Sequence, residues 1–498
     1  MSLCRRLAGH SQYQPDKPAI VFEEGQITYH QLNVLTQHCI EYFKQLGLET
    51  GDRVALLSMN HPDWFIALFA AAQTGIVLVP LNWRLSVDEL SYVIQDSTPK
   101  LLFFDEAFAD AARQLANSHS MHTQRIGTHE FPSGCDEPST QAIDLGSAVP
   151  EESDLLIVYT SGTTGRPKGA VLSQRALLCS AAMSQHMLDL TPYDRVLNVL
   201  PLFHVGGLNI QPLPALLYGA TLHLQAKFDP ECAVRSLESD QITLINSVPT
   251  VLRAMVDTSH WSSANFNALR AVSIGSSDVP LPLIRQVHER GLKLIQVYGT
   301  TETSPTAIYQ RIEQAHMEGS IGRSGLLNDV RLVSPDGRDV PIGESGEILV
   351  RGENVLSRYW NNPDATEQCL EDGWFKTGDM AHQDESGFYW FDDRVKHVVI
   401  SGGENIYPAE LERVIREIPG IGDLAVVGQK DDRWGEVPVV AVVADGSINA
   451  ETILASCDSL AKFKRPKDVF FVDSMPRNAL GKIQIHELKK QLFGELTQ

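Results

Sequence analysis

Residues 159–169 read YTSGTTGRPKG, and the interpretation of the whole chain starts from this stretch. It continues from DLLIVYT (154–160), an apolar run typical of a buried strand. Its three glycines can turn backbone N–H groups toward one point, its Ser and Thr hydroxyls add donors, and Lys168 adds a positive charge. It is not a Walker loop, because Pro167 stands where the pattern starting at Gly162 requires glycine. The stretch therefore predicts a phosphate-binding loop of another kind.

On both sides of this loop, short apolar runs alternate with helical patterns. Strands that are apolar throughout and separated by helices indicate parallel sheets covered on both faces. The predicted strands are RVALLSM (53–59), IVLVPL (76–81), RVLNVLP (195–201), TLHLQ (221–225), ITLINSVP (242–249), LRAVSIG (269–275) and LKLIQVYG (292–299). The predicted helices include LTQHCIEYFKQLGL (35–48), DWFIALFAAAQTG (63–75), QRALLCSAAMSQHM (174–187) and LPLIRQVHER (281–290).

The pattern changes after about residue 319. RLVSPDGRDVPIGESGEILVRG (331–352) predicts a hairpin with PDG at its turn, and from Val395 the order of strands and helices predicts a small α+β domain. The charged stretch FDDRVKH separates the two patterns. We therefore expect an α/β protein with a large amino-terminal domain (1–393), a small mobile α+β domain (394–498) and a hinge near Asp393.

Composition excludes several classes of protein. The formal net charge of -21 argues against a nucleic-acid partner, which would require an excess of Lys and Arg. The seven cysteines are scattered and odd in number, which indicates reduced thiols. No apolar run follows the arginines of MSLCRRLAGHSQYQ. Elsewhere in the sequence, no apolar run approaches the ~20 residues of a membrane span. We expect no signal peptide, no stable membrane insertion and a cytoplasmic location.

The glycine-rich loop resembles the signature loop of the adenylate-forming superfamily, which includes acyl-CoA synthetases, nonribosomal-peptide adenylation domains and beetle luciferases. Five further segments are similar to segments of that superfamily and occur in its order. They are PLFHVGG (201–207), YGTTE (298–302), TGD (377–379), DDRVKHVVISGGENIYPAELE (392–412) and PRNALGKI (476–483). The resemblance therefore covers nearly the whole chain and implies the adenylate-forming fold.

The resemblance implies a nucleotide site. It places Tyr298 beside adenine, Thr301 at the α-phosphate and Glu302 on Mg²⁺, a cation that prefers oxygen ligands and substrate phosphates. It places Asp379 on both ribose hydroxyls, with Arg394 also reaching the ribose. The ATP and AMP contacts implied are Thr160, Ser161, Gly162, Thr163, Thr164, Gly165, Lys168, Ser276, Tyr298, Gly299, Thr300, Asp379 and Arg394.

The resemblance also implies two half-reactions in one site. Lys482 would bridge the carboxylate and the α-phosphate during adenylation, so the catalytic set is Lys482, Thr301 and Glu302. Asp393 resembles the hinge about which the small domain swings. The swing would bring up Gly402 and Gly403, beside which the pantetheine arm of CoA would pass.

The acid pocket is implied by similar segments. His204 resembles the residue that gates it, and the other lining residues implied are Gly206, Gly207, Gly275 and Ser277. Glycine at positions 206 and 207 leaves room in the pocket for an extended chain or an arylpropenoate tail. Two features depart from the family pattern. SIGSSDVP (273–280) replaces a Gly-Ala-Pro-like run, and His397 replaces an acidic residue.

The resemblance favours an ATP-dependent carboxylate–CoA ligase that uses ATP, Mg²⁺ and CoA. The acid would be a medium- or long-chain fatty acid or a hydroxycinnamate such as ferulate. A stand-alone adenylation enzyme that loads an acyl or aryl group onto a carrier protein is the alternative. A non-catalytic nucleotide sensor is a further hypothesis, disfavoured because Lys482 and Glu302 are both present. We take a homodimer as the default assembly.

Overall fold

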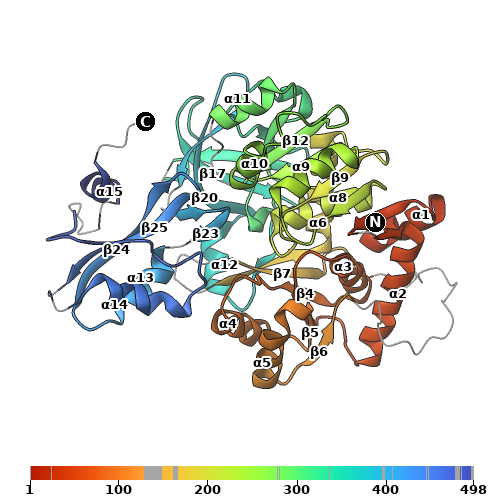
Figure 1. Ribbon diagram of the computed structural model, residues 1–498, viewed down its shortest axis with the longest axis horizontal. Coiled ribbons are helices and arrows are strands. Elements are labelled where there is room, and N and C mark those ends of the chain that lie inside the picture. The colour runs from red at the N-terminus through yellow and green to blue at the C-terminus, as the bar shows by residue number, and fades with distance from the viewer. Residues whose placement is uncertain are drawn as a thin grey trace. The chain divides into compact units, whose positions relative to one another are not determined.

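The computed structural model of the chain divides into two compact units (Figure 1). The large unit contains residues 1–83, 91–159 and 169–393, and the small unit contains residues 84–90, 160–168 and 394–498. The structure describes residues 2–23, 25–127, 149–160, 167–276, 279, 281–334, 336–394, 399–406, 408–444, 446, 448–476, 483 and 485–494. No helix among these residues is long and apolar enough to cross a membrane.

The first sheet of the large unit has nine strands in the order β15-β14-β13-β12-β11-β9-β10-β1-β2. Its strands from β13 to β1 pair in parallel, whereas β2, β14 and β15 pair antiparallel at the two edges. The strands are β1 (Pro18–Phe22), β2 (Gly25–Thr28), β9 (Arg195–Asn198), β10 (Thr221–Leu224), β11 (Leu244–Ser247), β12 (Ala271–Gly275), β13 (Leu294–Tyr298), β14 (Ile308–Tyr309) and β15 (Arg323–Ser324).

The second sheet has seven strands in the order β18-β8-β7-β4-β3-β5-β6. Strands β7, β4, β3, β5 and β6 pair in parallel, and β18 pairs antiparallel with β8. Its strands are β3 (Arg53–Leu57), β4 (Val77–Pro80), β5 (Leu101–Phe104), β6 (His122–Arg125), β7 (Asp154–Thr160), β8 (Lys168–Ser173) and β18 (Arg358–Tyr359). The predicted parallel sheets are therefore confirmed in both cases.

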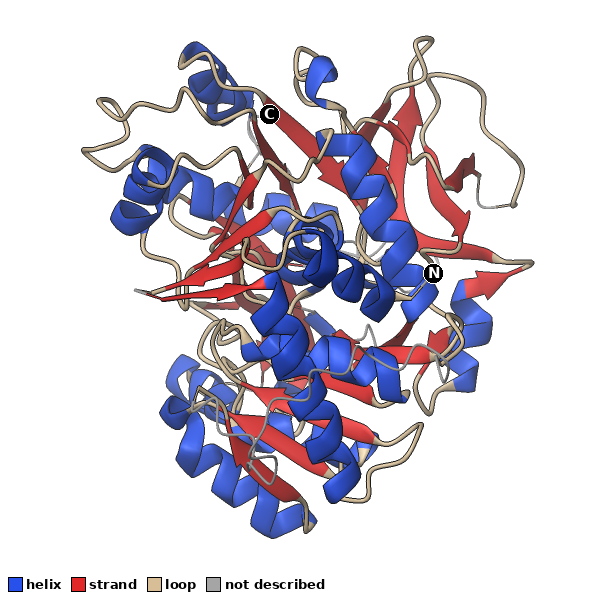
Figure 2. Cartoon of the chain, turned by 90° about the vertical axis from the view of Figure 1, so that its right-hand side faces the viewer, coloured by secondary structure: helices blue, strands red, loops and turns tan. Residues whose placement is uncertain are grey.

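Helices pack beside the strands of both sheets (Figure 2). One apolar core joins residues of the two sheets to α1 (Leu3–Tyr13), α2 (Tyr29–Gln45), α3 (Asp63–Thr74), α6 (Gln174–Leu188) and α8 (Pro212–Leu217). A second core places α9 (Pro230–Ser239), α10 (Pro249–Val256) and α11 (Leu281–Glu289) against the nine-stranded sheet. The seven-stranded sheet also carries α4 (Val87–Ser97) and α5 (Ala109–His119), and α5 lies beside β5 and β6 (Figure 1).

Local sequence signals explain where several helices begin. Thr28 and Gln31 form a capping box at the start of α2, which satisfies two backbone N–H groups that the helix leaves free. Asp229 caps α9, and Pro230 follows at a position where the missing N–H costs nothing. Gly75 ends α3 in the left-handed conformation, with φ of 74°.

A third sheet in the large unit follows the order β16-β17-β20-β19, with β21 beside β20. Its strands are β16 (Asn328–Val333), β17 (Gly346–Gly352), β19 (Leu370–Glu371), β20 (Trp374–Gln383) and β21 (Tyr389–Arg394). The predicted pairing of the two strands in 331–352 is confirmed, because β16 and β17 are antiparallel. The turn at PDG does not join them directly, however. It returns the chain beside β16, where Val340 N–H donates to Leu332 O at 3.0 Å, and β17 begins six residues later.

The small unit contains a five-stranded sheet in the order β23-β22-β25-β24, with β26 beside β25. Its strands are β22 (Val399–Ser401), β23 (Glu404–Ile406), β24 (Ile421–Asp431), β25 (Gly435–Ala444) and β26 (Val469–Phe471). One apolar core lies under α13 (Pro408–Arg416) and α14 (Ala450–Ser456), and another lies under α15 (Ile485–Phe493). The small α+β fold expected from the sequence is present.

Candidate active site

Two residues predicted for the nucleotide meet at the carboxyl end of β13. The Tyr298 hydroxyl donates to Asp379 Oδ2 at 2.9 Å, although the two residues are 81 positions apart in the chain. Asp379 belongs to β20 and is only 4% exposed, and its backbone N–H donates to Thr377 Oγ1. The structure thus brings together the aromatic ring and the carboxylate assigned to the nucleoside.

The turn after β13 is sharply constrained at Gly299. A Cβ at this position would lie 1.5 Å from the Pro305 carbonyl oxygen, so only glycine fits. A short 3-10 helix, Thr301–Thr303, follows, and Thr300 caps it. The hydroxyl of Thr300 is buried and has no hydrogen-bond partner among the described residues. This turn therefore presents an unsatisfied hydroxyl beside the residues predicted to face phosphate.

The carboxylate of Glu302 is held in place by Tyr359. The Tyr359 hydroxyl donates to Glu302 Oε1 at 2.7 Å, and the backbone carbonyl of Glu302 accepts from Leu356 N–H at 2.7 Å. Tyr359 is buried at the end of β18. One fixed carboxylate beside a turn predicted to face phosphate would fit a Mg²⁺ ion, which commonly combines one or two protein carboxylates with substrate phosphates. The sequence analysis missed Tyr359, for which no motif gave a signal.

The three glycines predicted for the acid pocket have different surroundings. A Cβ at Gly207 would lie 2.1 Å from the Pro201 carbonyl oxygen, and one at Gly275 would lie 2.2 Å from that of Val297. These two glycines are required by close backbone packing. A Cβ at Gly206 would meet nothing nearer than Ser276 Oγ at 3.8 Å, so Gly206 is the one of the three where a side chain would make only ordinary contacts.

His204 caps the short helix α7 (Val205–Asn209), and its ring packs on Phe203 with centroids 4.4 Å apart. Ser276 follows β12 with φ of 70°, a strained conformation for a residue other than glycine. Because β12 and β13 pair in parallel with Gly275 opposite Val297, Ser276 and Tyr298 leave the sheet at the same edge. His204, Gly206, Ser276 and Tyr298 thus belong to one region of the large unit.

A buried polar network lies behind Gly206 and was missed by the sequence analysis. Asn246 Nδ2 donates to Gly206 O at 3.1 Å, Ser273 Oγ donates to Asn246 Oδ1 at 2.7 Å, and Gln211 Nε2 donates to Ser273 Oγ at 3.1 Å. Gln211 Oε1 and both amide atoms of Asn209 have no partner among the described residues. Asn209 and Gln211 are each 1% exposed.

The strands that flank the glycine-rich loop are described, but the loop itself is not. Tyr159 Oη donates to Asp96 Oδ2 at 2.5 Å, and Thr160 Oγ1 donates to the Lys168 carbonyl at 3.5 Å. The predicted contacts Ser161, Gly162, Thr163, Thr164 and Gly165 lie outside the described residues, as do Ser277 and Lys482.

In the small unit, Gly402 and Gly403 form the turn between β22 and β23. Both have positive φ, 58° and 82°, which glycine adopts without strain. Gly402 N–H donates to the Trp434 carbonyl at 2.8 Å. The backbones of Asp393 and Arg394 lie in β21, and the structure does not describe their side chains.

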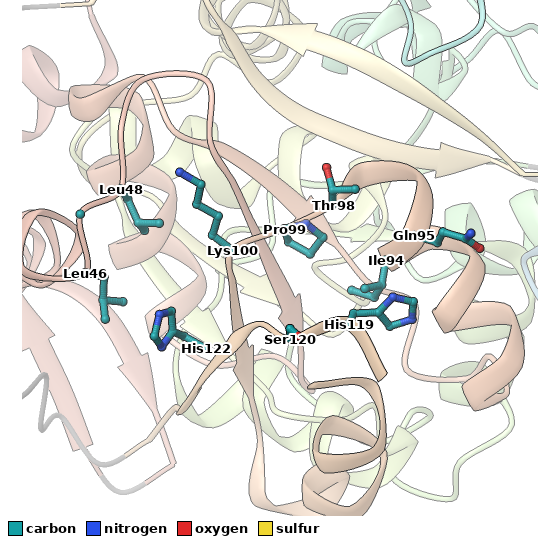
Figure 3. A pocket seen from close by; sticks show the side chains of 11 residues that line it. Leu46, Leu48, Ile94, Gln95, Thr98, Pro99, Lys100, His119, Ser120 and His122 are labelled. Carbon is teal, nitrogen blue, oxygen red and sulfur yellow. The ribbon is translucent and has the colours of Figure 1, made fainter. Parts of the chain in front are cut away.

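A cavity of about 410 Å³ lies elsewhere, at the amino ends of β5 and β6 (Figure 3). Its basic residues are spread around it, with Lys100 and His122 on one side and His119 on the other (Figure 3). Lys100 is paired with Asp52 at 2.6 Å, and His119 is hydrogen-bonded to Ser91. The loop after β7 leaves the opposite edge of this parallel sheet, so the cavity is not part of the site above.

Comparison with known proteins agrees with these observations. The model of the AMP-binding enzyme family matches residues 7–360, and the model of the AMP-binding enzyme C-terminal domain matches residues 410–482. An indoleacetate–CoA ligase of Aromatoleum aromaticum is 42% identical over 503 residues, with 98% of each chain covered. A feruloyl-CoA synthase of an Amycolatopsis species is 38% identical over 490 residues, with 97% of each chain covered.

Solved structures of the o-succinylbenzoate CoA synthetase of Bacillus subtilis are also similar. A double mutant bound with a product analogue has a TM-score of 0.88 and 31% identity, covering 97% of this chain and 98% of that one. The same enzyme in complex with ATP and a magnesium ion has a TM-score of 0.72 and 30% identity, covering 97% and 99%.

The chain therefore belongs to the AMP-binding enzyme family. Within the adenylate-forming superfamily it is an AMP-forming acyl-CoA synthetase, that is, an ATP-dependent carboxylate–CoA ligase. The family prediction made from the six sequence segments is confirmed.

Proposed function

We propose that this ligase acts on an aromatic carboxylic acid whose ring system carries a hydrogen-bonding group, such as an arylacetate or a hydroxycinnamate. The observation that carries the proposal is the buried Gln211, which belongs to the network that ends at Gly206 and whose Oε1 has no partner among the described residues. A fatty acid, which the sequence left open, fits this network poorly.

The physical reason is the cost of unpaired polar atoms. A buried donor or acceptor without a partner costs about 1–3 kcal/mol, and a saturated chain offers no partner. A ring N–H or O–H near Gln211 Oε1 would supply the missing donor. Sites that hydrogen-bond a substrate group reject analogues lacking that group far more strongly than apolar pockets reject an extra methylene. Indoleacetate and ferulate, named for two relatives, both carry such a group.

We further propose that Tyr298 and Asp379 hold the nucleoside of ATP, while Thr301 contacts the α-phosphate. The contact between Tyr298 and Asp379 supports this assignment. Glu302, oriented by Tyr359, would hold Mg²⁺, which would neutralise charge on the phosphates. His204, Gly206 and Ser276 would line the acid pocket.

In the first half-reaction, a carboxylate oxygen of the acid attacks the α-phosphorus, and the bond to pyrophosphate breaks. Lys482 would stabilise the charge that develops there. In the second, the CoA sulfur attacks the acyl carbon, AMP leaves, and the thiol proton is lost to solvent. Rotation about Asp393 would exchange Lys482 for the turn at Gly402 and Gly403 between the two steps. These assignments rest on the matching sequence motifs.

The experiment is AMP release by purified protein with ATP and Mg²⁺, with and without CoA. The acids are indole-3-acetate, ferulate, 4-coumarate, benzoate, octanoate and palmitate. Turnover that requires CoA and is fastest with an acid bearing a ring N–H or O–H supports the proposal. Preference for octanoate or palmitate contradicts it. Acyl-AMP that accumulates without faster loss on adding CoA would identify a different thiol acceptor.

We also propose a cytoplasmic location and a homodimer. The location is supported by the cysteines, because the six that the structure describes (Cys4, Cys39, Cys179, Cys232, Cys369 and Cys457) are free thiols. The homodimer has only the general frequency of twofold assemblies in its favour. Light scattering of the purified protein would distinguish a dimer of twice 55.0 kDa from a monomer.

A further inference from the structure

Tyr159 is the last residue of the large unit before the glycine-rich loop, and its side chain is anchored on a different element. Its hydroxyl donates to Asp96 Oδ2 at 2.5 Å, a short hydrogen bond to the carboxyl-terminal turn of α4. Burial and the Asp96 carboxylate both raise the pKa of Tyr159 far above its usual range. The phenol therefore remains protonated, and so a donor, at neutral pH.

Gly169, which follows the glycine-rich loop, is also linked to Asp96, through Trp360. Trp360 N–H donates to the Gly169 carbonyl at 2.7 Å, and Trp360 Nε1 donates to the Asp96 carbonyl at 3.1 Å. A Cβ at Gly169 would lie 3.2 Å from the Tyr159 ring and 3.2 Å from Trp360 Cβ. Tyr159 and Gly169, which flank the loop, are thus fixed by contacts that converge on Asp96.

Asp96 is itself held firmly. Asn361 Nδ2 donates to its backbone carbonyl at 3.0 Å, and Arg53 Nε donates to the carbonyl of the next residue, Ser97, at 2.7 Å. The guanidinium of Arg53 lies over the Trp360 ring, 5.5 Å from its centroid. Residues from β3, α4, β7 and the segment after β18 therefore meet at this point.

We propose that Tyr159, Asp96 and Trp360 form a clamp that fixes both flanks of the glycine-rich loop and thereby sets the affinity of the enzyme for ATP. Glycine-rich segments lose much conformational freedom when they bind a ligand, and fixing their ends lowers that loss. These three are positioning residues, since they act on the phosphates through the loop. The inference rests on the proposed function only in assigning that loop to ATP.

The test compares Tyr159→Phe, Asp96→Asn and Asp96→Ala with the wild type. Losing the hydroxyl should raise both the Kd for MgATP, measured by calorimetry without acid, and the KM for ATP by about 5- to 10-fold, the scale of the net contribution of one intramolecular hydrogen bond. KM for the acid and for CoA should stay within about twofold. Asp96→Asn keeps an acceptor oxygen, so its effect should be smaller than that of Asp96→Ala.

Tyr42→Phe is the matched control, because it removes a hydroxyl that donates to Gln124 Oε1 at 3.2 Å, away from the loop. It should leave the Kd for MgATP unchanged. If Tyr159→Phe lowers thermal stability but binds MgATP as the wild type does, the clamp is only structural and the inference is wrong. Calorimetry measures MgATP binding without any acid. If the wild type binds MgATP but activates none of the tested acids, the proposed substrate class is wrong, and the Kd values of the variants still test the clamp.

Discussion

Tyr359 fixes the carboxylate of Glu302, the residue that we propose as the Mg²⁺ ligand. The Tyr359 hydroxyl occupies one lone pair of Glu302 Oε1 and fixes the orientation of the carboxylate. Groups that orient a metal ligand typically contribute 10- to 100-fold in metal affinity or activity.

We expect Tyr359→Phe to raise the Mg²⁺ concentration for half-maximal AMP release by about 10-fold, because the carboxylate loses its orienting donor. The measurement is a Mg²⁺ titration at saturating acid and CoA. Glu302→Gln, which removes the charge itself, should have a larger effect. An unchanged Mg²⁺ titration for Tyr359→Phe would show that Glu302 is not the metal ligand or needs no orienting partner.

Gln211 provides a residue-scale test of substrate choice. Gln211→Leu removes the unpaired Oε1, so an acid with a ring N–H or O–H should lose its advantage over octanoate by about 10- to 100-fold in relative kcat/KM. Gln225→Leu is the matched control. Gln225 Oε1 is also buried and has no partner in the described part of the chain, but the amide nitrogen of Gln225 donates to Ser236, outside the network behind Gly206. An equal change in both variants would contradict the role given to Gln211.

Sequence could predict the residue types of this site but not their contacts. Tyr298, Glu302 and Asp379 could be predicted as site residues because short motifs contain them. Tyr359 and Gln211 were missed, because their importance comes from neighbours 57 and 62 positions away. A hydrogen bond between two segments that are distant in the chain cannot be predicted from the sequence pattern of either segment.

At the scale of elements, α7 shows why two adjacent glycines are not equivalent. Gly207 packs its α-carbon against the Pro201 carbonyl, whereas Gly206 has ordinary clearance. The motif FHVGG does not distinguish the two glycines. Only the packing of α7 separates Gly207, where a Cβ would clash, from Gly206, where a Cβ would make ordinary contacts.

We therefore expect Gly207→Ala to lower the free energy of unfolding by about 2–3 kcal/mol, because a backbone carbonyl cannot move aside as a side chain can. Gly206→Ala should change it by less than about 0.5 kcal/mol and should instead raise the KM of the acid. Urea unfolding and acid-dependence of AMP release measure the two effects. Equal destabilisation of both variants would mean that α7 adjusts its position.

Capping residues and apolar runs predict some boundaries of the helices and strands, but not all of them. Parallel strands were predictable from their continuous apolar runs. The helix predicted over 35–48 begins earlier, at Tyr29, because Thr28 caps it, and the start of α9 follows from Asp229. The PDG turn was placed correctly, but the sequence did not reveal that the returning residues pair with one edge of β16 while β17 pairs with the other. Which strand occupies which edge depends on long-range packing.

For the whole molecule, a change in sequence pattern near Asp393 indicated two parts. No pattern in the sequence indicated that residues 84–90 and 160–168 group with the small unit. Such grouping depends on contacts between segments hundreds of residues apart. One of these contacts is the ion cluster of Lys464, Glu410 and Glu89, all within the small unit, in which Lys464 Nζ lies 2.8 Å from an oxygen of each carboxylate.

This cluster predicts how the stability of the small unit depends on pH. Burial lowers the pKa of Lys464, but Glu410 and Glu89 raise it more, so its pKa is above its usual value. A raised pKa means that the cluster stabilises the folded state fully below the unfolded-state pKa of ~10.4, and that this contribution is lost as the pH rises through the folded-state pKa. At pH 7, Lys464→Met should lower the free energy of unfolding by about 3 kcal/mol, because it leaves the buried carboxylate of Glu410 and the partly buried carboxylate of Glu89 without their cation.

The measurement is hydrogen exchange of the amides of β24 and β25 at pH 7, which reports opening of the small unit by itself, followed by urea unfolding between pH 7 and 11. The difference between the wild type and Lys464→Met should be constant up to about pH 10 and shrink above it. Lys462→Met, at an exposed lysine two residues away, should match the wild type throughout. A difference between the wild type and Lys464→Met that persists unchanged to pH 11 would show that Lys464 stabilises the small unit through its buried methylenes and not through its charge.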